Sequence, residues 1–119
     1  KAVYGNIDGR KIRAIYPKIQ KFTCENVKVL MTHIGGYPNN YTKDIEKEIE
    51  SFKPDLYICG HSHILKIMYD KKYQLIHINP GSAGKEGFHQ KRTVVLLSIQ
   101  NTKIHDIRVV ELGPRAKLT

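Results

Sequence analysis

The sequence predicts an α/β fold in which mixed β-sheets stack as a sandwich with one flanking helix. Three observations predict it: an amphipathic helical pattern in the first half, an apolar run directly after it, and pairs of apolar runs joined by short turns in the second half. A helix-linked strand early in a chain and antiparallel strands late in it are typical of this class. A length of 119 residues suits a single domain with its own core.

Three strands are predicted before the helix. A very short apolar run, "AVY" at residues 2–4, is the first. Residues 18–23 and 27–32 are strand-like runs on either side of Glu25 and Asn26, and this arrangement predicts a hairpin. The second of these runs, "VKVLMT", leads directly into a polar, glycine-containing loop.

The one clear helix is predicted to start after Thr42, a residue type that caps helices, with Asp44 near the positive end of the helix dipole. The sequence "KP" at residues 53–54 ends the helix, because a residue before proline avoids the helical conformation. Its apolar stripe consists of Ile45, Ile49 and Phe52.

The remaining strands are predicted after the helix. Residues 55–59, "DLYIC", are apolar on both faces, as expected of an interior strand that is covered on two sides. Residues 64–69 and 73–78 suit a second hairpin, and residues 93–99 and 103–112 suit a third.

Composition and charge limit the classes of function. With 40% hydrophobic and 26% charged residues, and no run of about 20 apolar residues, the chain is expected to be a globular protein without a membrane span. Its start at Lys1 does not suit a signal peptide. The two cysteines, Cys24 and Cys59, make neither a disulfide framework nor a four-thiolate zinc site, which favours a reducing, cytoplasmic location.

The net charge of +9 comes from 20 Lys and Arg against 11 Asp and Glu. Such an excess favours anionic partners, either phosphate esters or nucleic acid. The basic residues are spread along the chain rather than gathered in a block, so nucleic-acid binding is possible but not favoured over a solvated basic surface. The sequence does not determine the oligomeric state.

Three polar loops each follow an apolar run: "GNID" at residues 5–8, "THIGG" at 32–36 and "GHSH" at 60–63. Neighbouring strands of an α/β sheet can bring such loops together at their carboxyl ends, where ligands bind. Imidazole nitrogen and amide oxygen atoms suit zinc, manganese or iron. The side chains that we expect to converge there are Asn6, His33, His61 and His63.

A single histidine is more often a surface or hydrogen-bonded residue than a metal ligand. We assign His77, His89 and His105 to that class, because two of them lie within predicted strands and one lies in a basic loop. Ser62 is interpreted as a spacer or as a hydrogen-bond donor behind the site, and Cys59 as a small buried side chain rather than a nucleophile.

Four motifs in order, "GNID", "MTHIGG", "GHSH" and "INPGSAG", resemble those of the calcineurin-like metallophosphoesterases, above all the small prokaryotic phosphodiesterases of that superfamily. The resemblance extends from residue 2 to about residue 111. It implies hydrolysis of phosphate esters, in particular phosphodiesters, by a water that two metals activate. The alternative is a catalytically inactive scaffold of the same fold that acts in protein binding, as the related retromer cargo-sorting subunit does.

The resemblance also implies roles for individual residues. Asn6, His33 and His61 would hold one divalent ion and His63 would reach a second, with manganese, zinc, iron or nickel as candidates. Asn6 and His33 are the residues that the likeness places in catalysis. Asp8 suits a position behind the ligands. Arg10, His89, Lys91 and Arg92 are candidate phosphate contacts, and the loop residues Asn79, Gly81 and Ser82 could position backbone donors.

The sequence departs from the family pattern at its start. Many relatives have a leaving-group histidine at the position of Ile7, and none of the five aspartates forms the Asp-x-His or Gly-Asp motif that supplies the remaining ligands. We therefore expect residues 1–119 to be a single domain that is the C-terminal part of a metallophosphoesterase domain, without its first βαβ portion. On this hypothesis the intact parent is an enzyme and this chain alone is inactive, because repulsion between two cations would lack a bridging carboxylate.

Overall fold

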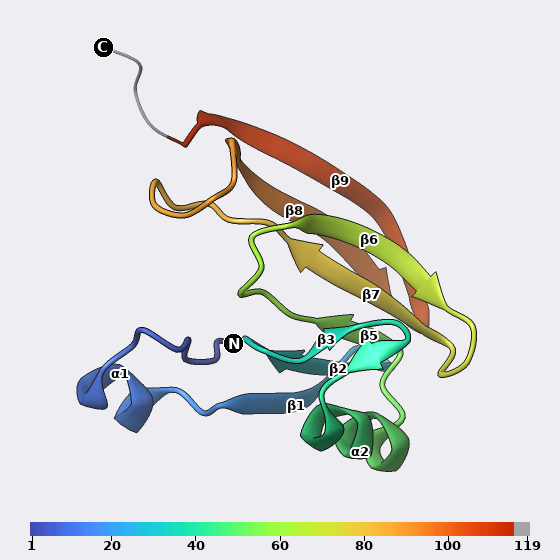
Figure 1. Ribbon diagram of the computed structural model, residues 1–119. Helices are drawn as coiled ribbons and strands as arrows, with labels where there is room; N and C mark the ends of the chain where they lie inside the picture. Colours follow the sequence, from blue (N-terminus) through green and yellow to red (C-terminus); the bar gives the residue numbers. More distant parts are fainter. Residues whose placement is uncertain (116–119) are drawn as a thin grey trace.

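The computed structural model describes residues 1–115, which form two main β-sheets, a small two-stranded hairpin and two helices (Figure 1). The larger sheet has five strands in the order β1-β2-β5-β7-β6. Its strands are β1 (Ile19–Cys24), β2 (Val27–Thr32), β5 (Leu56–Ile58), β7 (Leu75–Pro80) and β6 (Leu65–Asp70). The second sheet pairs β8 (Lys91–Gln100) with β9 (Lys103–Pro114), and the predicted sandwich of mixed sheets with a flanking helix is confirmed.

The large sheet is mixed. Its pairs β1–β2 and β6–β7 are antiparallel hairpins, as the sequence predicts, whereas β2, β5 and β7 run parallel to one another. The carboxyl ends of these three strands therefore meet at one edge of the sheet. β5 is the central strand, and its residues Leu56 and Tyr57 are buried on opposite faces, as expected for the run "DLYIC".

Each face of the large sheet has its own core. On one face, α2 (Lys43–Phe52) packs Ile45 and Ile49 against Leu30 and Tyr57. On the other face, Val29 and Leu56 pack with Val95 and other partly buried side chains of β8 and β9. Full burial of such an aliphatic side chain contributes about 1.5–3 kcal/mol, so the two cores fix how the sheet edge is presented.

The helix α2 has the predicted ends. Thr42 occupies the N-cap position and Asp44 lies in the first turn. The hydroxyl of Thr42 makes no capping hydrogen bond, however, and its Oγ1 is buried without a partner. At the other end Lys53 adopts a left-handed conformation with φ of 52°, and Pro54 follows it, so the helix cannot continue.

Three local features differ from the sequence prediction. Residues 2–4 form no strand: Tyr4 N donates to Pro17 O over 3.1 Å, and this segment pairs with no strand among residues 1–115. The short helix α1 (Arg10–Ile15) was not predicted, because it has only six residues and none of them is buried. A small hairpin of β3 (Gly36–Tyr37) and β4 (Asn40–Tyr41) lies within the loop that follows β2. Within the part of the chain that the structure describes, neither helix has the length and apolar character needed to cross a membrane.

Candidate functional site

Two of the predicted loops lie side by side at the carboxyl edge of the large sheet. His33 follows β2, and His61 and His63 lie in the loop after β5. Because β2 and β5 are parallel neighbours, both loops leave the sheet at the same edge. The backbone joins them directly, since Gly60 N donates to His33 O over 2.9 Å.

Asn6 joins two of these histidines from the N-terminal loop. Its Oδ1 lies 2.8 Å from His33 Nε2 and 3.2 Å from His61 Nδ1. The two imidazole rings meet edge to face, with centroids 5.2 Å apart. Because a carboxamide oxygen can only accept, both ring nitrogens donate to it. We call these three residues the imidazole–amide cluster.

The N-terminal loop is held in place although no strand precedes it. Asp8 Oδ2 accepts a hydrogen bond from Gly5 N over 2.7 Å, so this carboxylate closes the turn, and Asp8 lines the same cavity as the histidines. Arg13 of α1 donates from Nε to Asp8 O over 2.8 Å and from Nη2 to Asn6 O over 3.4 Å. Arg13 therefore positions Asn6, a role that the sequence analysis missed because α1 itself was missed.

His63 lines the same cavity, of about 610 Å³, but its Nδ1 lies 3.1 Å from Nδ1 of His89 rather than beside Asn6. His89 Nε2 lies 2.8 Å from the carbonyl oxygen of Gly84. Since a carbonyl oxygen only accepts, His89 Nε2 carries the proton, so in the neutral ring its Nδ1 accepts from His63 Nδ1. Because this pairing involves Nδ1 of His63, it leaves the lone pair on Nε2 of His63 available. His89 is thus a hydrogen-bonded residue, within the class to which the sequence analysis assigned it, although the sequence did not indicate its contact with His63.

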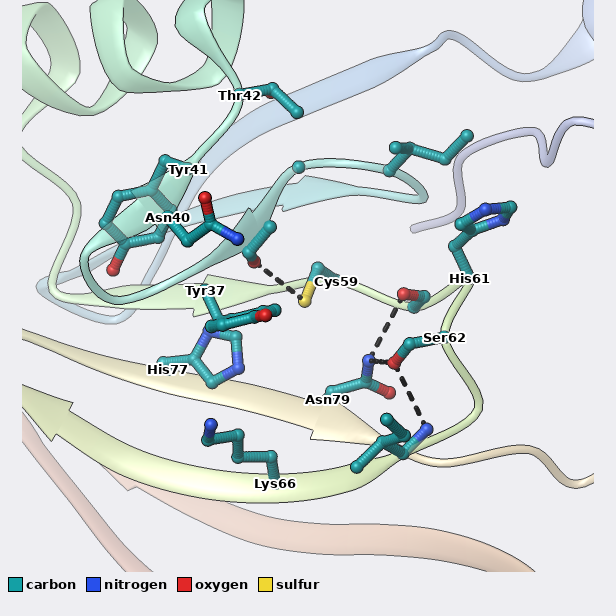
Figure 2. Close-up of a pocket in the computed structure, with 15 residues that line it drawn as sticks. Tyr37, Asn40, Tyr41, Thr42, Cys59, His61, Ser62, Lys66, His77 and Asn79 are labelled. Atoms are coloured by element: carbon teal, nitrogen blue, oxygen red, sulfur yellow. Dashed lines mark hydrogen bonds between the residues drawn. The ribbon is translucent and has the colours of Figure 1, made fainter. Parts of the chain in front are cut away.

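The "GHSH" loop has an unusual backbone. His61 and His63 both have positive φ, 71° and 62°, a left-handed conformation that is uncommon for residues other than glycine. Asn79 of β7 stabilises this loop: its Nδ2 donates to Gly60 O over 3.2 Å and to Ser62 Oγ over 3.0 Å (Figure 2). Ser62 Oγ also accepts from Ile64 N over 3.2 Å. Ser62 is therefore a hydrogen-bonded spacer that directs its two histidine neighbours to different partners.

Burial and neighbouring charge favour the neutral form of His33. Its pKa is lowered, first by burial and then by the adjacent His61, although the Asp8 carboxylate acts in the opposite direction. The Cys59 thiol is buried, and burial raises its pKa to about 11. Cys59 thus stays protonated near neutral pH, as expected of a core side chain rather than a nucleophile.

The basic candidates for phosphate contacts lie mostly elsewhere. Lys91 Nζ lies 3.5 Å from Glu111 Oε1, and the Arg92 guanidinium donates to the carbonyl oxygens of Leu112 and Pro114, so both side chains are engaged with β9. Arg10 is exposed on α1.

His77 is neither a surface residue nor satisfied at both nitrogens, because it is 1% exposed and its Nδ1 has no hydrogen-bond partner.

Residues 1–115 contain no group of three or more His, Cys, Asp or Glu side chains placed to hold a metal ion. The imidazole–amide cluster differs from such a group because its centre is the amide oxygen of Asn6. The structure thus brings Asn6, His33 and His61 into contact and places His63 in the same cavity, turned toward His89.

Comparison with known proteins shows the family of the chain. Residues 1–102 match the model of the calcineurin-like phosphoesterase superfamily domain, and the chain belongs to this family. A comparison with curated proteins finds no significant match.

Solved structures support the fold. An archaeal phosphodiesterase superposes with a TM-score of 0.67 at 21% identity, covering 92% of this chain and 67% of that protein. Vps29 of Entamoeba histolytica, solved with zinc, gives a TM-score of 0.66 at 17% identity, covering 93% of this chain and 67% of that one. A Thermotoga maritima protein gives 0.62 at 21% identity, covering 92% of this chain and 64% of the other. The chain thus spans about two thirds of the length of these structural neighbours.

Proposed function

We propose that this chain carries the asparagine and histidine part of a divalent-metal site for the hydrolysis of phosphate esters, in particular phosphodiesters. The observation that carries the proposal is the contact of Asn6 Oδ1 with both His33 Nε2 and His61 Nδ1. Membership of the calcineurin-like phosphoesterase superfamily supports it.

The residues present fit one divalent ion. Donor atoms that each lie about 2.1 Å from the same ion are about 3 Å apart, and the separations of 2.8 and 3.2 Å at Asn6 agree with this spacing. One amide oxygen and two imidazole nitrogens suit zinc, manganese, iron or nickel. The lowered pKa of His33 favours the neutral ring that a metal requires.

His33 and His61 donate ring protons to Asn6 without a metal, so coordination through the same nitrogens displaces those protons and requires a change of tautomer. A bound divalent ion supplies acidity to a coordinated water and neutralises charge on a phosphate. The amide nitrogen of Asn6 remains a donor for a phosphate oxygen, which gives Asn6 and His33 the catalytic roles in this proposal.

The residues present offer fewer ligands for a second metal ion. His63 offers Nε2, whereas Asp8, the carboxylate of the N-terminal loop, is bonded to Gly5 N. We therefore include in the proposal that residues 1–119 are the C-terminal part of one metallophosphoesterase domain, whose remaining ligands come from a portion outside these residues. The length ratio to the structural neighbours supports this division. The proposal places the protein in the cytoplasm, where its two free cysteines, Cys24 and Cys59, remain reduced.

A catalytically inactive scaffold that binds proteins is the second candidate. The Vps29 structures among the neighbours are compatible with it. Beside the cluster, Ile7 is 92% exposed and Phe88 is fully exposed, and both line the cavity that holds the cluster. Exposed apolar side chains of this kind suit a contact with another protein.

Metal analysis of the purified protein, followed by turnover of bis(4-nitrophenyl) phosphate with manganese or zinc, tests the proposal. We expect one tightly bound ion per chain, lost in Asn6→Ala and His33→Ala and retained in the control His105→Ala. For the domain as a whole, supplied with the N-terminal portion, we expect hydrolysis. Absence of metal binding in both forms contradicts the metal site; metal binding without turnover in the longer form favours the scaffold.

A further inference from the structure

The loop between β7 and β8 reaches the cavity of the imidazole–amide cluster through one contact that the proposed function does not use. His63 Nδ1 lies 3.1 Å from Nδ1 of His89, and the two rings meet edge to face with centroids 4.9 Å apart. His89 is 26 residues from His63, so the contact joins two segments that are distant in the sequence. We call these two residues the histidine pair.

The pair has a fixed order of donors and acceptors. The carbonyl oxygen of Gly84, 2.8 Å from His89 Nε2, can only accept, so Nε2 carries the proton of a neutral His89. The lone pair of His89 is then on Nδ1, and the proton between the two rings comes from Nδ1 of His63. A neutral His63 that is protonated at Nδ1 has its lone pair on Nε2, where a metal ion can bind.

His89 does not act on the cavity directly. Both of its ring nitrogens are paired, so a neutral His89 has no N–H left for a phosphate oxygen, the contact that the sequence suggested for it. The residues that line the cavity of about 610 Å³ include His63 but not His89. Any effect of His89 on this site must therefore pass through His63.

The loop that carries His89 leaves room for the pair. Gly87 has φ of 128°, and a Cβ atom there would overlap the His63 ring and lie 3.0 Å from His89 Nδ1. A side chain at position 87 is therefore incompatible with the pair. Arg115, directly after β9, donates from Nη1 to Gly87 O and from its backbone N to Gln90 O, so the loop is held on both sides of His89.

The backbone of His63 is held separately from its ring. Asn79 Nδ2 donates to Ser62 Oγ over 3.0 Å, and Ser62 Oγ accepts from Ile64 N over 3.2 Å (Figure 2). These bonds flank His63, whose φ is 62°. The turn thus sets the position of the backbone, while His89 sets the direction of the ring. A ligand that is fixed in both ways is oriented before a metal ion arrives.

We infer that His89 is a positioning residue for His63: it accepts the Nδ1 proton of His63, orients the ring and leaves Nε2 as the ligand for a second divalent ion. The ion rests on the proposed function; the order of the hydrogen bonds does not. Histidines that bind metals generally donate their other ring N–H to a partner, and loss of that partner typically lowers metal affinity about 10- to 100-fold. Here the partner is a second imidazole, which Gly84 O fixes in turn.

The first experiment determines which nitrogen of each ring is protonated, without metal. Long-range ¹H–¹⁵N NMR spectra distinguish protonated from unprotonated ring nitrogens. At a pH where the rings are neutral, we expect the proton on Nδ1 of His63 and on Nε2 of His89. His89→Phe keeps a ring but removes the acceptor, so His63 should lose its preference for Nδ1, whereas the control His105→Ala should not change it. A wild-type His63 that is protonated at Nε2 overturns the inference.

The second experiment titrates zinc alone into the same proteins. The first equivalent should shift the ring nitrogens of His33 and His61, and further zinc should shift Nε2 of His63 while its Nδ1 stays protonated. His89→Phe should weaken zinc binding at His63 about tenfold or more and leave the zinc at the cluster in place.

The variant His89→Asn separates hydrogen bonding from ring packing. The side-chain oxygen of asparagine is as many bonds from Cα as Nδ1 of histidine is, and it can accept the same proton. His89→Asn should therefore restore most of the zinc affinity at His63, although it lacks the ring that His89→Phe retains.

The outcomes distinguish the pair from the metal site. Equal zinc affinity at His63 in the wild type and His89→Phe overturns the inference, although the metal site stands. Equal weakening in His89→Phe and His89→Asn also overturns it, because the acceptor would then not matter. Zinc bound at no histidine contradicts the proposed function, while the metal-free spectra still decide the order of the hydrogen bonds.

Discussion

The two cavities on either side of the "GHSH" loop share His61 and Ser62 but differ in how their polar atoms are paired. In the cavity of the imidazole–amide cluster, the oxygen of Asn6 already has two imidazole partners. The other cavity, of about 500 Å³ on the α2 face of the sheet, is lined by Thr42 and His77, each of which has a buried polar atom without a partner. Polar loops at strand ends form the first, and strand faces with a small hairpin form the second.

The difference teaches that one loop with left-handed residues can form a wall of two cavities of different character. The cluster is organised before any ligand arrives, so its geometry favours a small, strongly charged partner. The cavity of about 500 Å³ on the α2 face is instead enclosed mainly by strand faces and the β3–β4 hairpin, with Lys66 as its one lysine or arginine. A change to one cavity should therefore leave the other intact unless it moves the loop between them.

The largest effect is expected at the cluster. His33→Ala or Asn6→Ala should lower affinity for zinc or manganese about a hundredfold or more, because one of three converging donors is lost. Isothermal titration calorimetry measures this, with His105→Ala as the control. An unchanged metal affinity in both variants would contradict the role of Asn6 and His33 as ligands.

His77, the buried histidine of β7, should make the stability of the protein depend on pH. Burial lowers the pKa of His77 to about 4, below the value of about 6.5 in an unfolded chain. Between these values the unfolded state binds a proton that the folded state does not, so stability is complete above pH 6.5 and falls as the pH decreases. At pH 5 the loss should be about 2 kcal/mol.

Urea unfolding at pH 7 and pH 5 measures this loss, and His77→Phe is the comparison because it keeps a buried ring without a titrating nitrogen. The variant should lose about 2 kcal/mol less than the wild type over the same interval. An identical loss in both proteins would show that other groups, His33 among them, cause the pH dependence.

Asn79 is expected to affect the cluster without touching it. Asn79→Ala should lower metal affinity about tenfold, because the loop that carries His61 and His63 loses its hydrogen bonds at Gly60 O and Ser62 Oγ. Asn79→Asp keeps an acceptor for Gly81 N but loses the donors, so it should be equally impaired. Gln100→Ala, at the exposed end of β8, serves as the control. Unchanged affinity in Asn79→Asp would show that the donors do not hold the loop.

A smaller effect is expected from backbone strain. His61→Gly should be more stable than His61→Ala by about 1 kcal/mol, because glycine adopts the left-handed conformation at φ of 71° without steric cost. Chemical denaturation of the two variants gives the difference. At His105, where φ is not positive, the alanine variant should be the more stable one, and the same order at both positions would exclude strain at His61.

The smallest effect is expected at the histidine pair. His63→Ala and His89→Ala should change affinity for a single ion about threefold or less, because His63 Nδ1 is directed to His89 and not to Asn6. Calorimetry on both variants and the double variant measures it. A loss at His63→Ala equal to that at His33→Ala would show that His63 joins the cluster when metal binds.

Most of the sheet could be predicted because its strands bear their own signals. The run "DLYIC" is apolar on both faces, and β5 is indeed central; the hairpins follow from paired apolar runs around short turns. The helix α1 gave no such signal, because it buries nothing and depends on local bonds such as Arg13 N to Gly9 O. The apolar run 2–4 suggested a strand, but a strand also needs a neighbour to pair with.

The contacts of Asn6, His33 and His61 could be foreseen because the ends of parallel strands meet at one edge. The direction of His63 could not, since it depends on a left-handed backbone and on His89, 26 residues away. The cavity on the α2 face of the sheet could not be predicted for a similar reason. His77 looks like any strand histidine in the sequence, and its burial arises only when Tyr57 of the neighbouring strand stacks on it.

The bond from Gly60 N to His33 O makes the two histidine loops a single mechanical unit. If the backbone at His33 moves away, the amide of Gly60 loses its acceptor, and the loop that carries His61 becomes less constrained. Opening should therefore occur as one cooperative event, visible as shared amide exchange kinetics for Gly60 and its neighbours.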